Sequence, residues 1–246
     1  MKKFLLPVVL LLSLQPVFAH QDTKQVSVEM VNVKGGKFDM GDDSAAMDRR
    51  PNHTVILKDF SISPTEVTQA QWEAVMGNNP SLYKCDDCPV TNVSWNDIQA
   101  FIEKLNTMTG KHYRLPTEAE WEFAARGGTL ENKENMKKYS GRKVLQYIAW
   151  FDRNANDHQH HVAKKRANEL GLYDMTGNVE EWVNDWYNKD YFSRKDVTNP
   201  QGPDGGNSKV VRGGSWKSEK DEVSVTRRAA YLPTTKSTSL GFRLAQ

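Results

Sequence analysis

The chain has 246 residues, of which 38% are hydrophobic and 26% charged, and its formal net charge at pH 7 is +2. This length and composition suit one large domain with a substantial core. Basic and acidic residues are interspersed, so the chain lacks the basic face that is typical of proteins that bind nucleic acid. We therefore expect a single folded domain and no nucleic-acid partner.

Residues 1–19 have the pattern of a secretory signal peptide. Two lysines precede an apolar run from Phe4 to Leu14, and a small-residue cleavage site ends at Ala19. The run is too short to span a bilayer, which needs about 20 residues. We expect cleavage after Ala19 and a mature domain of residues 20–246, with His20 first. This domain should be periplasmic or secreted, without a membrane anchor.

Residues 26–38 alternate loosely between apolar and polar side chains, and Gly35-Gly36 predicts the turn of a β-hairpin. Residues 40–52 are polar and acidic, which is typical of a surface loop. Residues 53–60, HTVILKDF, return to the pattern of a strand.

Three short helices are predicted by one start signal, a hydroxyl at the N-cap with an acid or amide three residues later. The pairs are Thr68 with Gln71, Ser94 with Asp97, and Thr117 with Glu120. The expected ends are Gly77, Gly110 and Gly127. In the third helix Trp121 should face the core. Its charged residues Glu118, Glu122 and Arg126 are spaced for ion pairs on the outer face.

The two cysteines, Cys85 and Cys88, lie in a CDDC sequence. In an exported chain this spacing favours a local disulfide. A redox motif would need a helix at these thiols, which the following Pro89 disfavours. Half of a metal site is the other alternative, but no further zinc ligands stand at a recognisable spacing.

After the third helix the pattern is weaker. Residues 148–151, IAWF, predict a short strand, and a long loop follows that contains His158, His160 and His161. These histidines are candidate ligands for a transition metal, although a histidine-rich loop without a carboxylate pattern is also typical of an exposed surface. Residues 209–216 and 238–244 predict two final strands.

Residues 171–186, GLYDMTGNVEEWVNDW, concentrate acids, glycines and tryptophans. As a helix they would place Asp174, Asn178 and Glu181 on one face. Gly177 favours a turn instead, and we expect a bent backbone that enters a short helix near Glu180. A turn exposes carbonyls, and Ca²⁺ takes about six to eight oxygen ligands. The segment is therefore a candidate calcium loop, with a solvated loop and a tryptophan anchor as the alternative.

Seven motifs in order resemble those of the formylglycine-generating enzyme, or sulfatase-modifying factor, family. They are GGKFDMG, TEVTQAQW, PVTNVSW, YRLPTEAEWEFAARGG, GLYDMTGNVEEW, VVRGGSW and LGFRLA. The match covers nearly all of the mature chain. The resemblance implies an α+β fold: a single compact domain with a C-type-lectin-like core, little regular secondary structure, long loops and bound calcium.

Carried over residue by residue, the family's calcium loop gives four ligands in this chain. They are the Asp174 side chain, the Gly177 and Val179 carbonyls, and the Glu181 side chain. The family often has asparagine where this chain has Asp174, and an acid keeps an oxygen ligand there.

The family's oxidase activity is a separate question. Its members hold Cu(I) between two cysteines, and use O₂ to oxidise a cysteine of a sulfatase. Alignment on the GGSW motif places Ser218 and Val223 at those positions. Because Cu(I) prefers thiolates, we do not expect copper or this activity, and iron is left open.

The leading hypothesis is an exported, calcium-stabilised domain that binds a small molecule, a peptide or a partner protein. The expected groove comprises Arg212, Trp216, Ser218, Val223 and Arg227. Its arginines and tryptophan are equally consistent with core packing and ion pairs.

The rival hypothesis is an altered periplasmic oxidoreductase or maturation factor of the pyoverdine-maturation type. It would use His158, His160 or His161 as metal ligands. Redox-active metal would favour this rival, whereas calcium alone would favour the binding domain.

Overall fold

The computed structural model describes residues 26–129, 138–141, 144–193 and 197–246. The predicted signal peptide lies outside the described residues. Within these ranges, no helix combines the length and apolar character that crossing a membrane requires.

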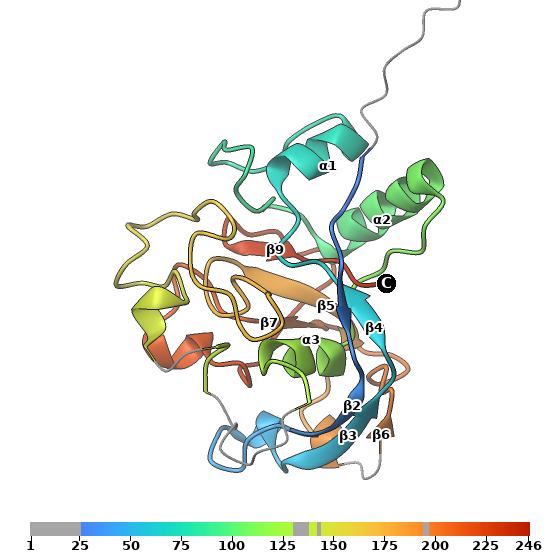
Figure 1. Cartoon of the computed structure of the whole chain (residues 1–246), viewed down its shortest axis with the longest axis vertical. Coiled ribbons are helices and arrows are strands. Elements are labelled where there is room, and N and C mark those ends of the chain that lie inside the picture. Colours follow the sequence, from blue (N-terminus) through green and yellow to red (C-terminus); the bar gives the residue numbers. More distant parts are fainter. Residues whose placement is uncertain (1–25, 130–137, 142–143, 194–196) are drawn as a thin grey trace, which may run out of the picture.

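Short strands form three sheets in the described part of the chain (Figure 1). The first pairs β1 (Val31–Val33) with β4 (Phe60–Ile62). The second has the order β2 (Gly36–Met40), β3 (His53–Leu57) and β6 (Val197–Thr198). The third has the order β8 (Ala229–Tyr231), β7 (Lys209–Arg212), β5 (Glu180–Trp186) and β9 (Leu240–Phe242). Long loops connect these elements, as expected for this α+β domain.

The predicted N-terminal hairpin is wrong. β1 pairs with β4 and β2 pairs with β3, so the first two strands lie along one longer partner segment and not against each other. At Gly35 a Cβ atom would lie 2.3 Å from the carbonyl carbon of Lys58. The glycine there permits close approach of two backbones and does not form a hairpin turn.

The structure confirms the three predicted helices and their starts. They are α1 (Gln69–Met76), α2 (Trp95–Thr109) and α3 (Glu118–Ala125), and each begins with a complete capping box. Gly77 and Gly110 end the first two in the left-handed conformation, with φ of 82° and 68°. The third ends one residue earlier than Gly127 indicated, because Arg126 is its C-cap.

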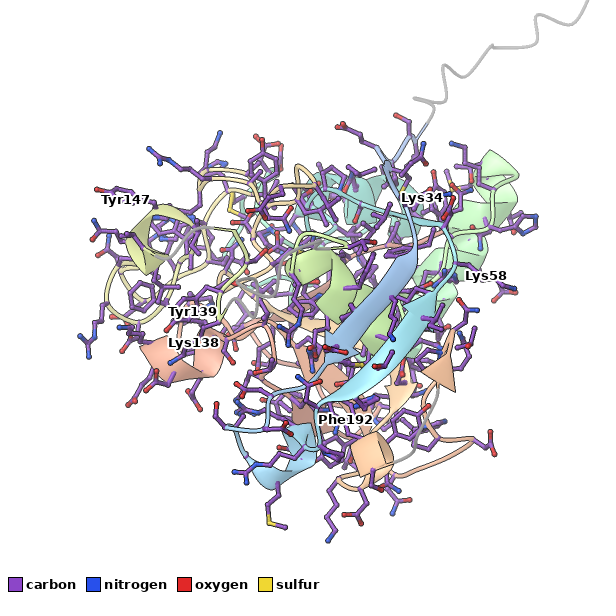
Figure 2. The ribbon with its side chains drawn as sticks, turned by 60° about the horizontal axis from the view of Figure 1, so that its bottom comes forward. Lys34, Lys58, Lys138, Tyr139, Tyr147 and Phe192 are labelled. Carbon is purple, nitrogen blue, oxygen red and sulfur yellow. A yellow bond between two sulfur atoms is a disulfide. The ribbon has the colours of Figure 1, made fainter. Side chains whose placement is uncertain are left out.

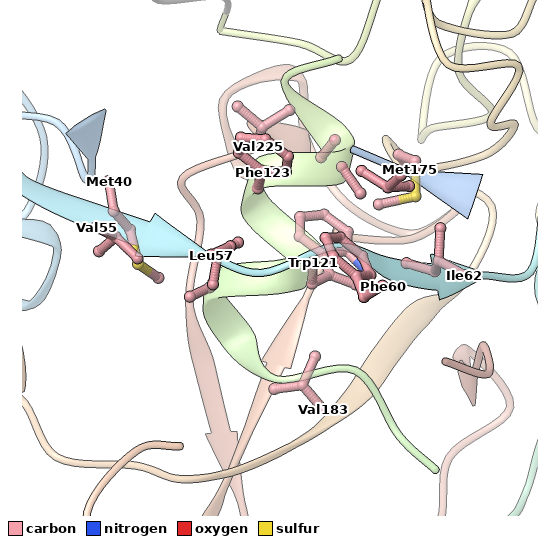
Figure 3. Close-up of a cluster of buried hydrophobic side chains, with 14 of the residues drawn as sticks. Met40, Val55, Leu57, Phe60, Ile62, Trp121, Phe123, Met175, Val183 and Val225 are labelled. Carbon is pink, nitrogen blue, oxygen red and sulfur yellow. The ribbon is translucent and has the colours of Figure 1, made fainter. Parts of the chain in front are cut away.

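Two apolar clusters form the main core. In one, Trp121 and Phe123 of α3 pack against residues of β2, β3 and β4 (Figure 3). In the other, α1 and α2 cover β9 and part of β5, and the Trp72 ring stacks on Phe101 with centroids 5.0 Å apart. Helix α3 therefore lies in the interior, between the β2–β3 sheet and the β5–β7 sheet.

The prediction that the charges of α3 face outward is wrong. Every residue of α3 is buried. Glu122 accepts hydrogen bonds from Arg126 and from Arg212, at 2.7 and 2.6 Å. Glu118 accepts from Arg212 and Arg228, at 2.9 and 2.6 Å. The expected pair of Glu122 with Arg126 exists, but inside the protein, because β7 and the segment before β8 bring two further arginines to it.

Two further local predictions are wrong. Residues 148–151 form no strand and follow a short 3-10 helix at Leu145–Tyr147. The backbone after the bent loop enters strand β5 and not a helix at Glu180. There, pairing with β7 on one side and β9 on the other outweighs any local helical preference.

Candidate functional site

The backbone between Tyr173 and β5 is bent, as predicted. Asp174, Gly177 and Asn178 all have positive φ, at 56°, 82° and 59°. A Cβ atom at Gly177 would lie 2.1 Å from the carbonyl oxygen of Trp150. Only glycine fits this position, which explains why the loop carries it.

The loop brings buried acids together with one arginine. Asp174 is 2% exposed, and Glu66 and Glu181 are fully buried. Both carboxylate oxygens of Glu181 accept hydrogen bonds from Arg243, at 2.7 Å each, and one also accepts from the indole of Trp121. Glu181 is therefore already neutralised within the protein.

The other two acids each present an oxygen without a partner. Asp174 Oδ2 accepts from the Ala163 N–H at 2.8 Å, and Glu66 Oε1 accepts from the Asn178 amide at 3.1 Å. Asp174 Oδ1 and Glu66 Oε2 are buried without a hydrogen-bond partner. Such orphaned oxygens are uncommon in a folded interior.

The electrostatics of this cluster favour an added positive charge. Burial, the Asp174 charge and the Glu181 charge raise the pKa of Glu66 well above its ordinary value. Burial is also the main cause that raises the pKa of Asp174 to about 6. Three buried carboxylates share the Arg243 guanidinium, and the Lys165 ammonium also acts on Asp174, so negative charge remains in excess. Unpaired carboxylate oxygens in a buried loop fit a hard cation such as Ca²⁺.

Glu66 is the residue that the sequence did not reveal as part of this cluster. It lies in the TEVTQAQW motif before α1, far in sequence from Asp174, and its only local signal was proximity to an N-cap. The structure brings it to the loop through Asn178. By its contacts it is a better candidate for a free ligand than Glu181.

The residues of the predicted groove separate into two groups. Arg212 is 1% exposed and lies in the ion-pair network of α3. Val223 is fully buried in an apolar cluster with Leu145 and Phe151. These two residues therefore lie in the interior and do not form a surface. Trp216, Ser218 and Arg227 are partly exposed.

Trp216 lies near a second tryptophan, Trp150, which the sequence did not indicate as part of a site. The Asn178 N–H donates to the Trp150 carbonyl, and the Trp216 N–H donates to the Asn178 carbonyl, both at 2.8 Å. Lys165 Nζ lies 3.7 Å from the Trp150 ring centroid, and Lys217 Nζ lies 4.7 Å from that of Trp216. We call these two tryptophans and two lysines the tryptophan patch.

The two indole N–H groups of the tryptophan patch make no hydrogen bond. Nε1 of Trp150 and Nε1 of Trp216 are both buried without a hydrogen-bond partner. The accessible chemistry of the patch is therefore that of the partly exposed tryptophan rings and the two ammonium groups beside the calcium-loop candidate. The ammonium groups suit a ligand with acidic groups.

A polar cavity of about 490 Å³ lies elsewhere, near the 3-10 segment Lys220–Val223. It is lined by Asp42, Ser44, Ala45, Arg49, Arg126, Lys138, Asp221, Ser224 and Thr226. Lys138 at its rim pairs with Asp221 at 2.6 Å, and Figure 2 shows Lys138 and Tyr139 beside this segment. None of the described residues that line it belongs to the predicted groove.

The three candidate histidines do not converge on one point. His160 stacks on Trp150 with ring centroids 3.7 Å apart, and its Nε2 lies 2.8 Å from the Ala155 carbonyl oxygen. The His158 ring lies beside it, 4.6 Å between centroids. His161 instead faces Cys85.

The predicted disulfide between Cys85 and Cys88 is present. Cys88 is fully buried, whereas Cys85 is partly exposed. This leaves no free cysteine in the described part of the chain.

Comparison with known proteins gives a match to the family model for the sulfatase-modifying factor enzyme 1-like domain over residues 15–246. Serine/threonine-protein kinase pkn1 of Chlamydia pneumoniae is 32% identical over 90% of this chain, which spans only 38% of that protein's length. Chaperone protein LppX of Paenibacillus barcinonensis is 30% identical over 82% of this chain and 83% of its own length.

Solved structures agree with this match. Treponema denticola variable protein 1 has a TM-score of 0.81 and 32% identity, and the match covers 88% of this chain and 94% of the other. PvdO from Pseudomonas aeruginosa has a TM-score of 0.75 and 25% identity, with 91% and 95% covered. These similarities extend over nearly the whole described fold.

Proposed function

Since the chain belongs to the sulfatase-modifying factor enzyme 1-like family, we propose that it is an exported, calcium-stabilised binding or accessory domain. In this proposal it does not catalyse copper-dependent formylglycine formation. The observation that carries the proposal is the environment of Ser218 and Val223, the residues aligned with the family's copper-binding cysteines.

Neither residue offers copper a suitable ligand. Ser218 Oγ accepts a hydrogen bond from the Ser215 N–H at 3.0 Å, and the Val223 side chain is enclosed by apolar neighbours. The only two cysteines of the chain, Cys85 and Cys88, are joined to each other. A Cu(I) centre needs soft ligands such as thiolates, so the absence of thiolates at these two positions supports a function other than copper-dependent oxidation.

The orphaned oxygens of Glu66 and Asp174 support calcium as the stabilising ion. Calcium there would join these side chains with the carbonyls of Gly177 and Val179, which the family resemblance implies as ligands. Its charge would offset the excess of buried carboxylates. The ion would therefore hold the loop that carries Asn178, and with it the backbone of the tryptophan patch.

The tryptophan patch, with Ser218 and Arg227 beside it, supports a binding role. Tryptophan and arginine are enriched at the residues that contribute most to binding between proteins. One relative that this chain matches over most of both lengths is named a chaperone, which is consistent with binding to another protein. We infer that the partner presents acidic or hydrogen-bond acceptor groups.

The first test is elemental analysis of the mature protein, purified from the periplasm without chelators. We expect stoichiometric calcium and no transition metal. In parallel, the protein is given Cu(I), O₂ and a peptide that carries a sulfatase-type cysteine, and aldehyde formation is followed by mass spectrometry. Turnover of this peptide would overturn the proposal, as would stoichiometric copper.

The binding role needs its own test. Proteins crosslinked in the periplasm to the wild type are compared with those crosslinked to Trp216→Ala and to the exposed control Leu82→Ala. We expect one identified partner to be lost only with Trp216→Ala, and purified partner to bind with the same ranking. Equal binding to all three proteins would contradict the assignment to the patch.

A second candidate function is a periplasmic oxidoreductase or maturation factor of the pyoverdine-maturation type, with which membership of the family is consistent. Its metal ligands would come from His158 and His160, whose rings lie together, while His161 lies apart. Stoichiometric iron or copper that is lost in His158→Ala and His160→Ala would favour this candidate over the binding domain.

A further inference from the structure

A second group of metal-binding side chains lies apart from the carboxylate cluster. The ligand atoms of Cys85, Cys88 and His161 all lie within 4.8 Å of one another, the one such group of histidine, cysteine and acid side chains in the described part of the chain. We propose that these residues form a site for a zinc-class divalent cation, which becomes available when a dithiol reduces the disulfide.

The third ligand is supplied by tertiary structure. Cys85 Sγ lies 3.7 Å from both Nδ1 and Nε2 of His161, so a small rotation of the ring presents either nitrogen. Asp87 Oδ2 lies 3.9 Å from His161 Nδ1, and this exposed carboxylate or a water molecule can complete four ligands. The sequence offered only half of this site, because the histidine lies 73 positions after Cys88 and 76 after Cys85.

Contacts other than the disulfide hold the ligands in place. The Val162 N–H donates to the Asp87 carbonyl at 2.9 Å, which joins the histidine loop to the cysteine turn. The first residues of α1 bind the same turn, since Gln69 N–H donates to the Cys88 carbonyl and its side-chain oxygen accepts from the Cys85 N–H, at 2.9 and 3.0 Å. Breaking the sulfur–sulfur bond would therefore leave the turn anchored.

The chemistry of the group matches zinc once the thiols are free. Zinc binds two thiolate sulfurs about 2.3 Å from the ion, which in a tetrahedral site places these sulfurs about 3.8 Å apart. Side-chain rotation of the two cysteines can give this separation, because their Cα atoms are 5.3 Å apart. In the disulfide neither sulfur is a thiolate, so the oxidised protein has no such site.

The opening step is a thiol–disulfide exchange with a dithiol reductant. A reductant thiolate attacks the Sγ atom of Cys85, the more exposed of the two residues, and Cys88 leaves as a thiolate. The second reductant thiol then displaces Cys85 and closes the reductant's own disulfide. Two electrons and two protons pass from the reductant to the two cysteines, and zinc binding releases those two protons.

The test uses the mature full-length protein and Co²⁺ as a spectroscopic probe for zinc. The protein is kept in excess Ca²⁺, so that the carboxylate cluster does not take up the probe. One sample is reduced with a dithiol, which is removed anaerobically, and the other stays oxidised. We expect one equivalent of Co²⁺ to bind the reduced protein with thiolate-to-cobalt charge-transfer absorption, and Zn²⁺ to displace it. The oxidised protein should give no such band.

Two variants test the ligands. His161→Ala should weaken Co²⁺ binding at least about tenfold, as expected for the loss of a direct ligand, whereas His112→Ala, an exposed histidine elsewhere, should not change it. Equal Co²⁺ spectra for oxidised and reduced protein, or for both variants, would overturn the proposal. If reduction unfolds the protein, Zn²⁺ should restore its circular dichroism, and failure to do so would also count against the site.

Discussion

Replacement of Asp174 by asparagine tests whether a cation completes the carboxylate cluster. The amide has nearly the same shape, and its oxygen can still accept the hydrogen bond that the Ala163 N–H now donates to Asp174 Oδ2. The change removes one of three buried negative charges while Arg243 stays in place. The variant should therefore be stabilised less by calcium than the wild type is.

The magnitude follows from the buried charge. Burial is the main cause that raises the pKa of Asp174 from 3.8 to about 6, so without calcium its ionised form costs up to about 3 kcal/mol at pH 7. Asp174→Asn should raise the free energy of unfolding by up to about that amount in a calcium chelator. With calcium at a hundred times its dissociation constant the wild type should gain about 2.7 kcal/mol. If the variant binds about tenfold more weakly, it gains only about 1.4 kcal/mol.

The assay is urea unfolding followed by tryptophan fluorescence, with the disulfide intact, in chelator and in excess calcium. Asp204→Asn, at an exposed position, is the matched control and should respond to calcium like the wild type. The reasoning would be refuted if Asp174→Asn lowered stability equally in both conditions, or if calcium did not stabilise the wild type.

Three other predictions concern stability. Gly177→Ala places a methyl group 2.1 Å from a neighbouring carbonyl oxygen, whereas the methyl group of the control Gly77→Ala meets nothing within 4 Å. The control should cost about 1–2 kcal/mol of left-handed strain, and Gly177→Ala should cost more. Equal losses of stability in urea unfolding would contradict this. Burial and the adjacent Glu118 charge raise the pKa of Asp185 from 3.8 to about 8, so this carboxyl lowers stability as pH rises between those values. Asp185→Asn should therefore stabilise the protein by up to about 4 kcal/mol at pH 7 and by little near pH 4, and a gain that is independent of pH would exclude this explanation. Although burial opposes it, two arginines lower the pKa of Glu122 from 4.5 to about 2. The stability that the ionised Glu122 contributes is therefore present above pH 4.5 and is lost as pH falls toward 2. Glu122→Gln should cost about 3–5 kcal/mol at pH 7 and much less near pH 2, which urea unfolding at the two pH values measures.

Local sequence was sufficient for the features that depend on neighbouring residues. The three helix starts were predicted because a capping box closes within four residues, as at Ser94 and Asp97. The bent loop at Gly177 and the disulfide at Cys85 and Cys88 were predicted for the same reason. The ordered motifs added the family and its α+β single-domain fold, which the family match and the similar structures confirm.

Tertiary structure decided the features that depend on distant residues. The sequence made Glu118 and Glu122 look like an outer helix face, yet Arg212 and Arg228 reach them from other segments and neutralise them in the core. Because it pairs with these glutamates, Arg212 lies in the interior and not in the predicted groove. A charge is tolerated inside only with its partner, and that partner was not local.

The candidate sites divide along the same line. The sequence alone located Asp174 and its loop. Only the tertiary structure shows that Glu66 contacts this loop and that Glu181 is already paired with Arg243. It likewise places His161 beside the cysteine turn. Neighbouring residues determine hydrogen-bonded turns and caps, whereas ligand sets and ion-pair networks form where segments far apart in the chain pack together.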